Sequence, residues 1–353
     1  MTIAIYAGKA YTNNIFREGI MQLAFSRPGD NFLIFCSRRQ ISFSTPGNVV
    51  FKTLPALPTN RYSRWLWRNF RLPALLKKHQ AEAFLSLEGG ASSKTGVTQI
   101  AWLVHTRLAP QQVKQMAGSN TAWSFCVSAF PSVYKSLQDI VPVKKNVLSN
   151  FGIAGEIKVF TDAQKLMARE TYASGTLYFT CLVTGATMEQ LFMLLKGFSK
   201  CKEWLKTSTK LVLLYSAGEP MPEVKQMHLY KYKNDVIFHS YKDSAGCHQV
   251  IAASLALVIL AENEEAIISG YAAMRMEVPV ISTDTNLYRE NFSEAALYVK
   301  PDATSISGAF TQVYKDEAFV QSLIHKGIRQ VENFTWEYTT SILVKTLFPS
   351  PVV

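Results

Sequence analysis

The chain has 353 residues, of which 48% are hydrophobic, and because this length exceeds that of one compact domain, two domains are predicted. Residues 1–150 contain 18 lysines and arginines and 5 aspartates and glutamates, which gives this half a net charge of +13. The whole chain carries +11, so the second half is slightly acidic. The first half therefore favours an anionic partner, namely a membrane surface, a lipid-linked phosphate or a polyanion, beside the alternative of a merely solvated basic surface. The longest apolar stretch, residues 250–261, is about half as long as a bilayer-spanning helix, which excludes a transmembrane segment.

The five cysteines are widely spaced along the chain: Cys36, Cys126, Cys181, Cys201 and Cys247. Without a CxxC pair they argue against a disulfide framework and a zinc site, and we expect buried, reduced thiols of a cytoplasmic protein. The histidines form no HxxxH or HExxH pattern, so neither a metal nor another cofactor is predicted. The first residues turn polar at Lys9 and are predicted to form a strand rather than a signal peptide.

Short apolar runs alternate with helical patterns from the start of the chain, which is typical of an α/β fold. The first elements are a strand at 3–6, a helix near 14–25 and a strand at 32–36. Further strands are predicted at 49–52, 83–87, 99–105 and 124–128, with a long helix at about 62–79 among them. Together these elements predict a first doubly wound sheet.

The predicted helix at 62–79 begins with a basic and aromatic sequence, RYSRWLWRNFR, over residues 61–71. Arg61, Arg64, Arg68 and Arg71 recur at helical spacing and form one cationic stripe, with Trp65 on a neighbouring face. Such a helix suits an anionic membrane or acceptor surface, and the alternative is a surface helix whose aromatic side chains pack into the first domain. Nucleic-acid binding is not expected, because no RRM, KH or helix-turn-helix pattern accompanies the charge.

A second series of strands is predicted at 178–183, 210–215, 236–239, 257–260, 278–282 and 297–299. It indicates a second sheet of the same kind, and turn-forming residues place the border near residue 157. The predicted domains are residues 1–157 and 158–353, with the last helix packing back on the first domain. Ligands of such pairs bind in the cleft between the two domains.

Generic dinucleotide, P-loop and serine-hydrolase motifs are absent, and the most distinctive segment is residues 263–282, NEEAIISGYAAMRMEVPVIS. It resembles the donor-site signature of glycosyltransferase family 4 (glycosyl transferases group 1), in which an acidic residue opens a glycine-containing loop and GxPVI leads into the next strand. The resemblance continues at 288–290, 294–302 and 334–337, and upstream at 99–106, 127–131, 235–241 and 252–259.

The resemblance implies a GT-B fold of two Rossmann-like domains facing a cleft, with residues 1–157 on the acceptor side and residues 158–353 on the nucleotide-sugar side. It implies a retaining, metal-free transfer of a sugar from a nucleotide-diphosphate sugar to a saccharide or lipid-linked acceptor, in cell-envelope polysaccharide synthesis. The basic charge of residues 1–150 adds the expectation of a place on the inner face of the membrane. His105 aligns with the histidine beside the reacting sugar, and Glu264 with a carboxylate that contacts the donor sugar. Gly8 and Lys9 stand where the family often has a glycine-rich turn over the donor phosphates, so the resemblance makes Lys9 a candidate for a phosphate contact. The alternatives are a histidine ending a buried strand and solvated side chains for Glu264 and Lys9.

Several positions depart from the family pattern at the donor site. Thr184 and Glu189 stand where the family has an arginine and a lysine, and Glu189 would repel a diphosphate. Ala272 replaces the second carboxylate, and Glu277 replaces the glycine before Val-Pro-Val-Ile. The alternative function is therefore a catalytically inactive partner or scaffold of an active transferase. A hydrolase or epimerase on a similar scaffold is a further alternative, although no catalytic carboxylate pair favours it.

Overall fold

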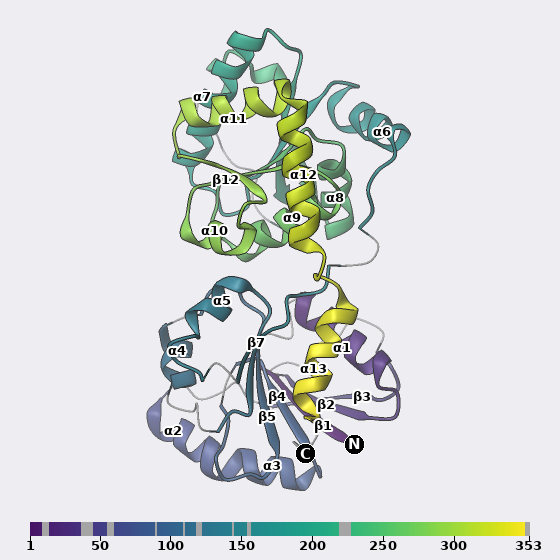
Figure 1. Ribbon diagram of the computed structural model, residues 1–353, viewed down its shortest axis with the longest axis vertical. Helices are drawn as coiled ribbons and strands as arrows, with labels where there is room; N and C mark the ends of the chain where they lie inside the picture. Colours follow the sequence, from purple (N-terminus) through teal and green to yellow (C-terminus); the bar gives the residue numbers. More distant parts are fainter. Residues whose placement is uncertain are drawn as a thin grey trace. The chain divides into compact units, whose positions relative to one another are not determined.

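The computed structural model describes residues 1–8, 14–36, 45–54, 60–88, 90–108, 110–117, 122–142, 145–153, 157–218 and 227–349. The chain divides into two compact units (Figure 1). Unit 1 comprises residues 1–154 and 333–353, and unit 2 comprises residues 155–332. The chain therefore leaves unit 1 after residue 154 and returns to it at residue 333 for the last helix.

Unit 1 is built on a seven-stranded parallel sheet of order β3-β2-β1-β4-β5-β6-β7. Its strands are β1 (Thr2–Gly8), β2 (Asn31–Cys36), β3 (Val49–Thr53), β4 (Ala83–Ser86), β5 (Thr98–Leu103), β6 (Phe125–Ser128) and β7 (Asn146–Leu148). The described helices are α1 (Asn14–Ser26), α2 (Arg61–Leu66), α3 (Leu72–Lys78), α4 (Pro110–Ala117), α5 (Pro131–Ser136) and α13 (Trp336–Leu347). Because both faces of the central strands are covered, β1 is buried from Ile3 onward, as its unbroken apolar sequence predicts.

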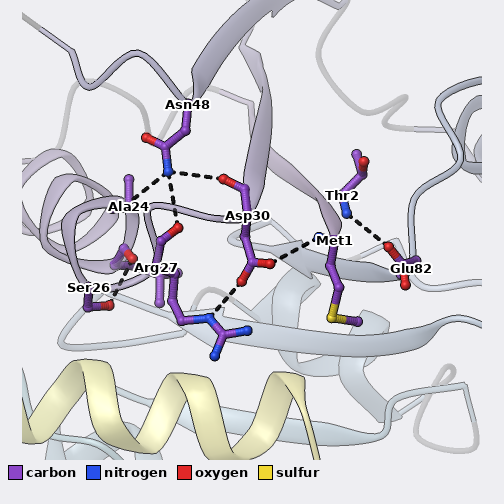
Figure 2. Close-up of polar contacts among 9 residues, drawn as sticks. Met1, Thr2, Ala24, Ser26, Arg27, Asp30, Asn48 and Glu82 are labelled. Carbon is purple, nitrogen blue, oxygen red and sulfur yellow. Dashed lines mark hydrogen bonds and ion pairs between the residues drawn. The ribbon is translucent and has the colours of Figure 1, made fainter.

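The amino ends of the first strands are joined by a polar network (Figure 2). The carboxylate of Asp30, which precedes β2, accepts hydrogen bonds from the N-terminal ammonium group at 3.0 Å and from Arg27 Nε at 2.6 Å. Asn48 Nδ2, before β3, donates to the backbone oxygens of Ala24, Arg27 and Asp30. Burial opposes ionisation of Asp30, but these two cationic donors outweigh it and lower the pKa of the carboxyl group.

The segment predicted as one regular helix at 62–79 is interrupted. Residues Trp67–Arg71 form a π-helical turn between α2 and α3, and the Leu72 N–H donates to Trp67 O, five residues back. Trp67 and Leu72 pack against Tyr6 and Phe84 of the sheet. The prediction of a single α-helical register was therefore wrong for this stretch, because one inserted residue lets Trp67 reach the core.

The last helix, α13, packs against α1 and against strands β4 and β5 of unit 1. A β-carbon on Gly152 would come within 2.1 Å of the Trp336 ring, so only glycine allows this close approach. The backbone N–H of Ile153 donates to Phe334 O at 2.9 Å, and the two segments thus run side by side.

Unit 2 holds a six-stranded parallel sheet of order β10-β9-β8-β11-β12-β13. Its strands are β8 (Tyr178–Leu182), β9 (Lys210–Ser216), β10 (Val236–Tyr241), β11 (Leu257–Ile259), β12 (Val280–Thr283) and β13 (Ala296–Val299). The described helices are α6 (Asp162–Ala173), α7 (Met188–Leu205), α8 (Ser244–Ala252), α9 (Glu264–Arg275), α10 (Asn286–Phe292), α11 (Ala303–Lys315) and α12 (Glu317–Val331). A hydrophobic core of the unit lies where α7 and α11 pack together against the sheet, and the rings of Phe179 and Phe310 stack there with centroids 4.4 Å apart.

All five cysteines are buried, as predicted, and none of them is in a disulfide bond. Burial raises the pKa of the Cys126 and Cys247 thiols to about 12, so these side chains act as small apolar groups of the core. In the parts of the chain that the structure describes, no helix is long and apolar enough to span a bilayer.

Candidate functional site

Each sheet reverses its strand order once, between β1 and β4 in unit 1 and between β8 and β11 in unit 2. In parallel α/β sheets the crevice outside the carboxyl ends of the strands at such a reversal is the usual place for a ligand. Gly8 and His105 lie at this edge of unit 1, and Glu264 lies at this edge of unit 2.

At the edge of unit 1, Gly8 ends β1 and Glu88 lies two residues beyond β4. Gly8 has φ +54°, and a β-carbon on it would lie 2.2 Å from the Glu88 carboxyl group. The positive φ favours glycine here, and the half-buried Glu88 carboxyl group fills the space that a β-carbon would take. Lys9 lies outside the described residues.

His105 lies two residues beyond β5, at the same carboxyl edge, and its side chain is half-buried. Thr106, the next residue, is buried and accepts a hydrogen bond on its backbone oxygen from Ser132 Oγ at 2.8 Å. Since β1, β4 and β5 are neighbouring strands, the structure places Gly8, Glu88 and His105 along one edge of the sheet.

At the edge of unit 2, Glu264 is the first residue of α9 and is half-buried. Asn263 caps this helix by accepting from the Ala266 N–H at 2.8 Å, and its Nδ2 donates to the backbone oxygen of Thr184 at 2.8 Å. Asn263 thereby joins the start of α9 to the loop after β8, directly across the strand reversal. Gly185 has φ +74°, and a β-carbon on it would come within 2.9 Å of Asn263 Nδ2.

Two further side chains connect elements at this edge. Tyr241, the last residue of β10, donates its hydroxyl hydrogen to Glu265 Oε1 in the first turn of α9. Burial and this carboxylate raise the pKa of Tyr241 well above that of an exposed tyrosine. Gln190 Nε2, in the first turn of α7, donates to Leu260 O at 2.9 Å.

The charge of this edge is unusual for a diphosphate site. Glu189 is exposed in the first turn of α7, where the helix dipole favours an anion, and it occupies that position with its own carboxylate. Glu262 is also exposed, and Glu264 and Glu265 are half-buried. Thr184 is buried, so its short side chain cannot replace the cation that the resemblance implies.

The two remaining departures from the family pattern lie on α9 and behind it. Ala272 is 1% exposed, and a carboxylate at this position would be buried in the present packing. Glu277 follows the C-cap residue Met276 with φ +59°, while the Val278 N–H donates to Ala273 O. This is a Schellman motif, so the backbone keeps the glycine conformation although the side chain is a glutamate.

The predicted cationic stripe is only partly present. Arg64 is half-buried, Arg71 is exposed, and the side chain of Arg61 lies outside the described part. Arg68 is half-buried, and its Nε donates to Ala91 O at 2.9 Å, which ties the π-helical turn to the loop before β5. Trp65 is 51% exposed.

Sequence reasoning missed Glu88, Tyr241 and Asn263 as residues of the two edges. Glu88 had a usable signal, because it is the first charged residue after a predicted strand. The hydrogen bond between Tyr241 and Glu265 had no such signal in the sequence, since it depends on which strands become neighbours. Within the described ranges, no three histidine, cysteine or carboxylate side chains gather as metal ligands.

Residues 165–330 match the family described as glycosyl transferases group 1. No curated protein matches the sequence. A glycosyltransferase from Rickettsia africae ESF-5 is similar in structure, with 12% identity and a TM-score of 0.73 over 98% of this chain and 97% of that chain. Anabaena Alr3699/HepE, solved with UDP and glucose, has 11% identity and a TM-score of 0.69 over 99% and 100%. WaaG, a glycosyltransferase involved in lipopolysaccharide biosynthesis, has 12% identity and a TM-score of 0.66 over 99% and 100%.

Proposed function

Because residues 165–330 match the glycosyl transferases group 1 family and the chain has the GT-B fold, we propose that the protein is a retaining glycosyltransferase. It transfers a sugar from a nucleotide-diphosphate sugar to a saccharide or lipid-linked acceptor in cell-envelope polysaccharide synthesis. The observation that carries the proposal is the position of Glu264, half-buried at the start of α9 and at the strand reversal of the matched segment.

In this proposal Glu264 contacts hydroxyl groups of the donor sugar, and His105 hydrogen-bonds the sugar during transfer. The departing nucleotide diphosphate gains negative charge, which the N–H groups at the starts of α7 and α9 stabilise. The bound UDP of the Anabaena protein supports a nucleotide as co-substrate here. No step of this scheme uses a metal ion.

We place the reaction in the cytoplasm, at the inner face of an anionic membrane. The support is the net charge of +13 on residues 1–150, which would attract the protein to acidic lipids. The part that WaaG plays in lipopolysaccharide biosynthesis is in keeping with a lipid-linked acceptor.

The test is calorimetric titration with UDP, GDP and ADP sugars, followed by an assay of nucleotide release with the donor that binds. We expect Kd values in the micromolar range for one base, and loss of turnover in His105→Ala and Glu264→Gln. Matched controls are His228→Ala and Glu262→Gln, both at exposed positions. Equal turnover in Glu264→Gln and Glu262→Gln would show that Glu264 is a solvated carboxylate without a role in donor binding.

A second function, an inactive partner or scaffold of an active transferase, is favoured by Glu189 and Ala272. An exposed carboxylate occupies the start of α7, and the position of the second donor carboxylate is 1% exposed. For this alternative we expect no heat with any nucleotide sugar, and co-purification with a complete transferase. Micromolar binding of a sugar nucleotide would exclude it.

A further inference from the structure

Three aromatic side chains form a cluster on the surface of unit 1. Tyr62, Trp65 and Phe70 are 70%, 51% and 55% exposed. The rings of Tyr62 and Trp65 stack with centroids 6.2 Å apart, and those of Trp65 and Phe70 meet edge-on at 5.5 Å. Exposed rings in mutual contact form an apolar patch, and such a patch usually marks an interaction site.

The π-helical turn brings this aromatic cluster together. In a regular α-helix two residues five apart point about 140° away from each other, so Trp65 and Phe70 would not meet. The i+5 geometry at Trp67–Arg71 instead puts residues five apart on one side. The opposite side is fixed, because Trp67 is buried against Tyr6 and Arg68 is bonded to Ala91 O. The rings are thus held outward by a firmly anchored segment.

The surroundings of the aromatic cluster are cationic. Lys94 Nζ lies 5.7 Å from the Phe70 ring centroid, and Arg71, Lys77 and Lys78 are exposed on the same helical segment. Residues 31–138 contain 13 lysines and arginines and only two acidic residues. This combination suits a surface that is both apolar and negatively charged.

We propose that the aromatic cluster enters the headgroup layer of an anionic membrane, with Arg71 and Lys94 against lipid phosphates. Aromatic rings prefer the headgroup level, and each nearby cation adds attraction to acidic lipid. The inference rests on the membrane location proposed above. It assigns the main contact with the membrane to the aromatic cluster instead of the predicted stripe of four arginines. Arg68 is assigned to the fold instead, because it holds the loop at Ala91.

The test is a sedimentation assay with two kinds of vesicle. Acidic vesicles contain three parts phosphatidylcholine to one part phosphatidylglycerol, and neutral vesicles contain phosphatidylcholine alone. The variant Trp65→Ala with Phe70→Ala should bind the acidic vesicles at least about tenfold more weakly, because burying one aromatic side chain is worth roughly a factor of ten or more. The loss should persist at high salt. Arg71→Gln with Lys94→Gln should weaken binding mainly at low salt, where charges are least screened.

Trp204→Ala is the matched control, since Trp204 is 67% exposed in unit 2 and should leave vesicle binding unchanged. Brominated lipid chains should quench tryptophan fluorescence of the native protein and not that of Trp65→Phe. If the cationic variant loses binding while Trp65→Ala with Phe70→Ala keeps it, the membrane location stands and the aromatic cluster is not the inserting part. If the native protein does not bind acidic vesicles, or binds neutral ones equally well, the proposed membrane location and the proposed insertion of the aromatic cluster are both wrong. This conclusion does not depend on the outcome of the nucleotide titration.

Discussion

Asn263 Nδ2 donates a 2.8 Å hydrogen bond to the backbone oxygen of Thr184, while Asn263 Oδ1 accepts from the Ala266 N–H. One amide thus caps α9 and joins it to the loop after β8. An aspartate at this position would keep the cap and lose the donor, so the two roles are separable.

Asn263→Asp is therefore expected to lower the free energy of unfolding by about 1–3 kcal/mol, because a carboxylate would face the Thr184 carbonyl oxygen. Chemical denaturation measures this change. The control is Asp302→Asn at the cap of α11, where Asp302 Oδ1 accepts from Thr304 and Ser305. Either residue caps a helix equally well, so a similar loss in both variants would show that the contact to Thr184 is unimportant.

Glu277→Gly is expected to stabilise the protein by about 0.5–1 kcal/mol. Glu277 has φ +59° at the end of α9, a conformation that costs an L-residue energy and costs glycine none. Thermal unfolding of the two proteins measures the difference. Glu277→Ala is the control, because alanine keeps the β-carbon and should give no gain; a gain in alanine would point to charge rather than backbone.

The alternation of strands and helices, and the resemblance at residues 263–282, predicted both sheets from the sequence. The π-helical turn was not predictable, because the arginine spacing at residues 61–71 fits an ordinary α-helix. The inserted residue depends on the packing of Trp67 into the core, which is a tertiary contact. Glu277 shows the converse: its sequence position suggested a lost glycine, yet the backbone kept the glycine geometry. The Tyr241–Glu265 hydrogen bond joins the end of β10 to the first turn of α9, and no local sequence pattern encodes this contact.

Asp30→Asn is expected to destabilise the protein by about 1–3 kcal/mol near neutral pH, because the N-terminal ammonium and Arg27 would lose their charged acceptor. The pKa of Asp30 is lowered on folding, so its contribution is complete above the unfolded value of about 3.9 and is lost as the pH falls through the folded value. Denaturation at pH 7 and pH 3 should show a difference between the proteins that shrinks in acid. Asp139→Asn, at an exposed site, should show little effect at either pH.

Glu189→Gln should strengthen binding of a nucleoside diphosphate by about two- to fivefold. The start of a helix stabilises a nearby anion by roughly 0.3–1 kcal/mol, and the Glu189 carboxylate repels a diphosphate that binds at the same place. The carboxylate is exposed in the first turn of α7, beside the loop that carries Thr184. Calorimetric titration with UDP at low ionic strength measures the change, and added salt should reduce it. Glu203→Gln is the control, because this exposed carboxylate lies in the last turns of the same helix, paired with Lys231. Equal affinity in the native protein and Glu189→Gln would place the diphosphate away from α7, whereas equal gains in both variants would reflect only the net charge of the protein.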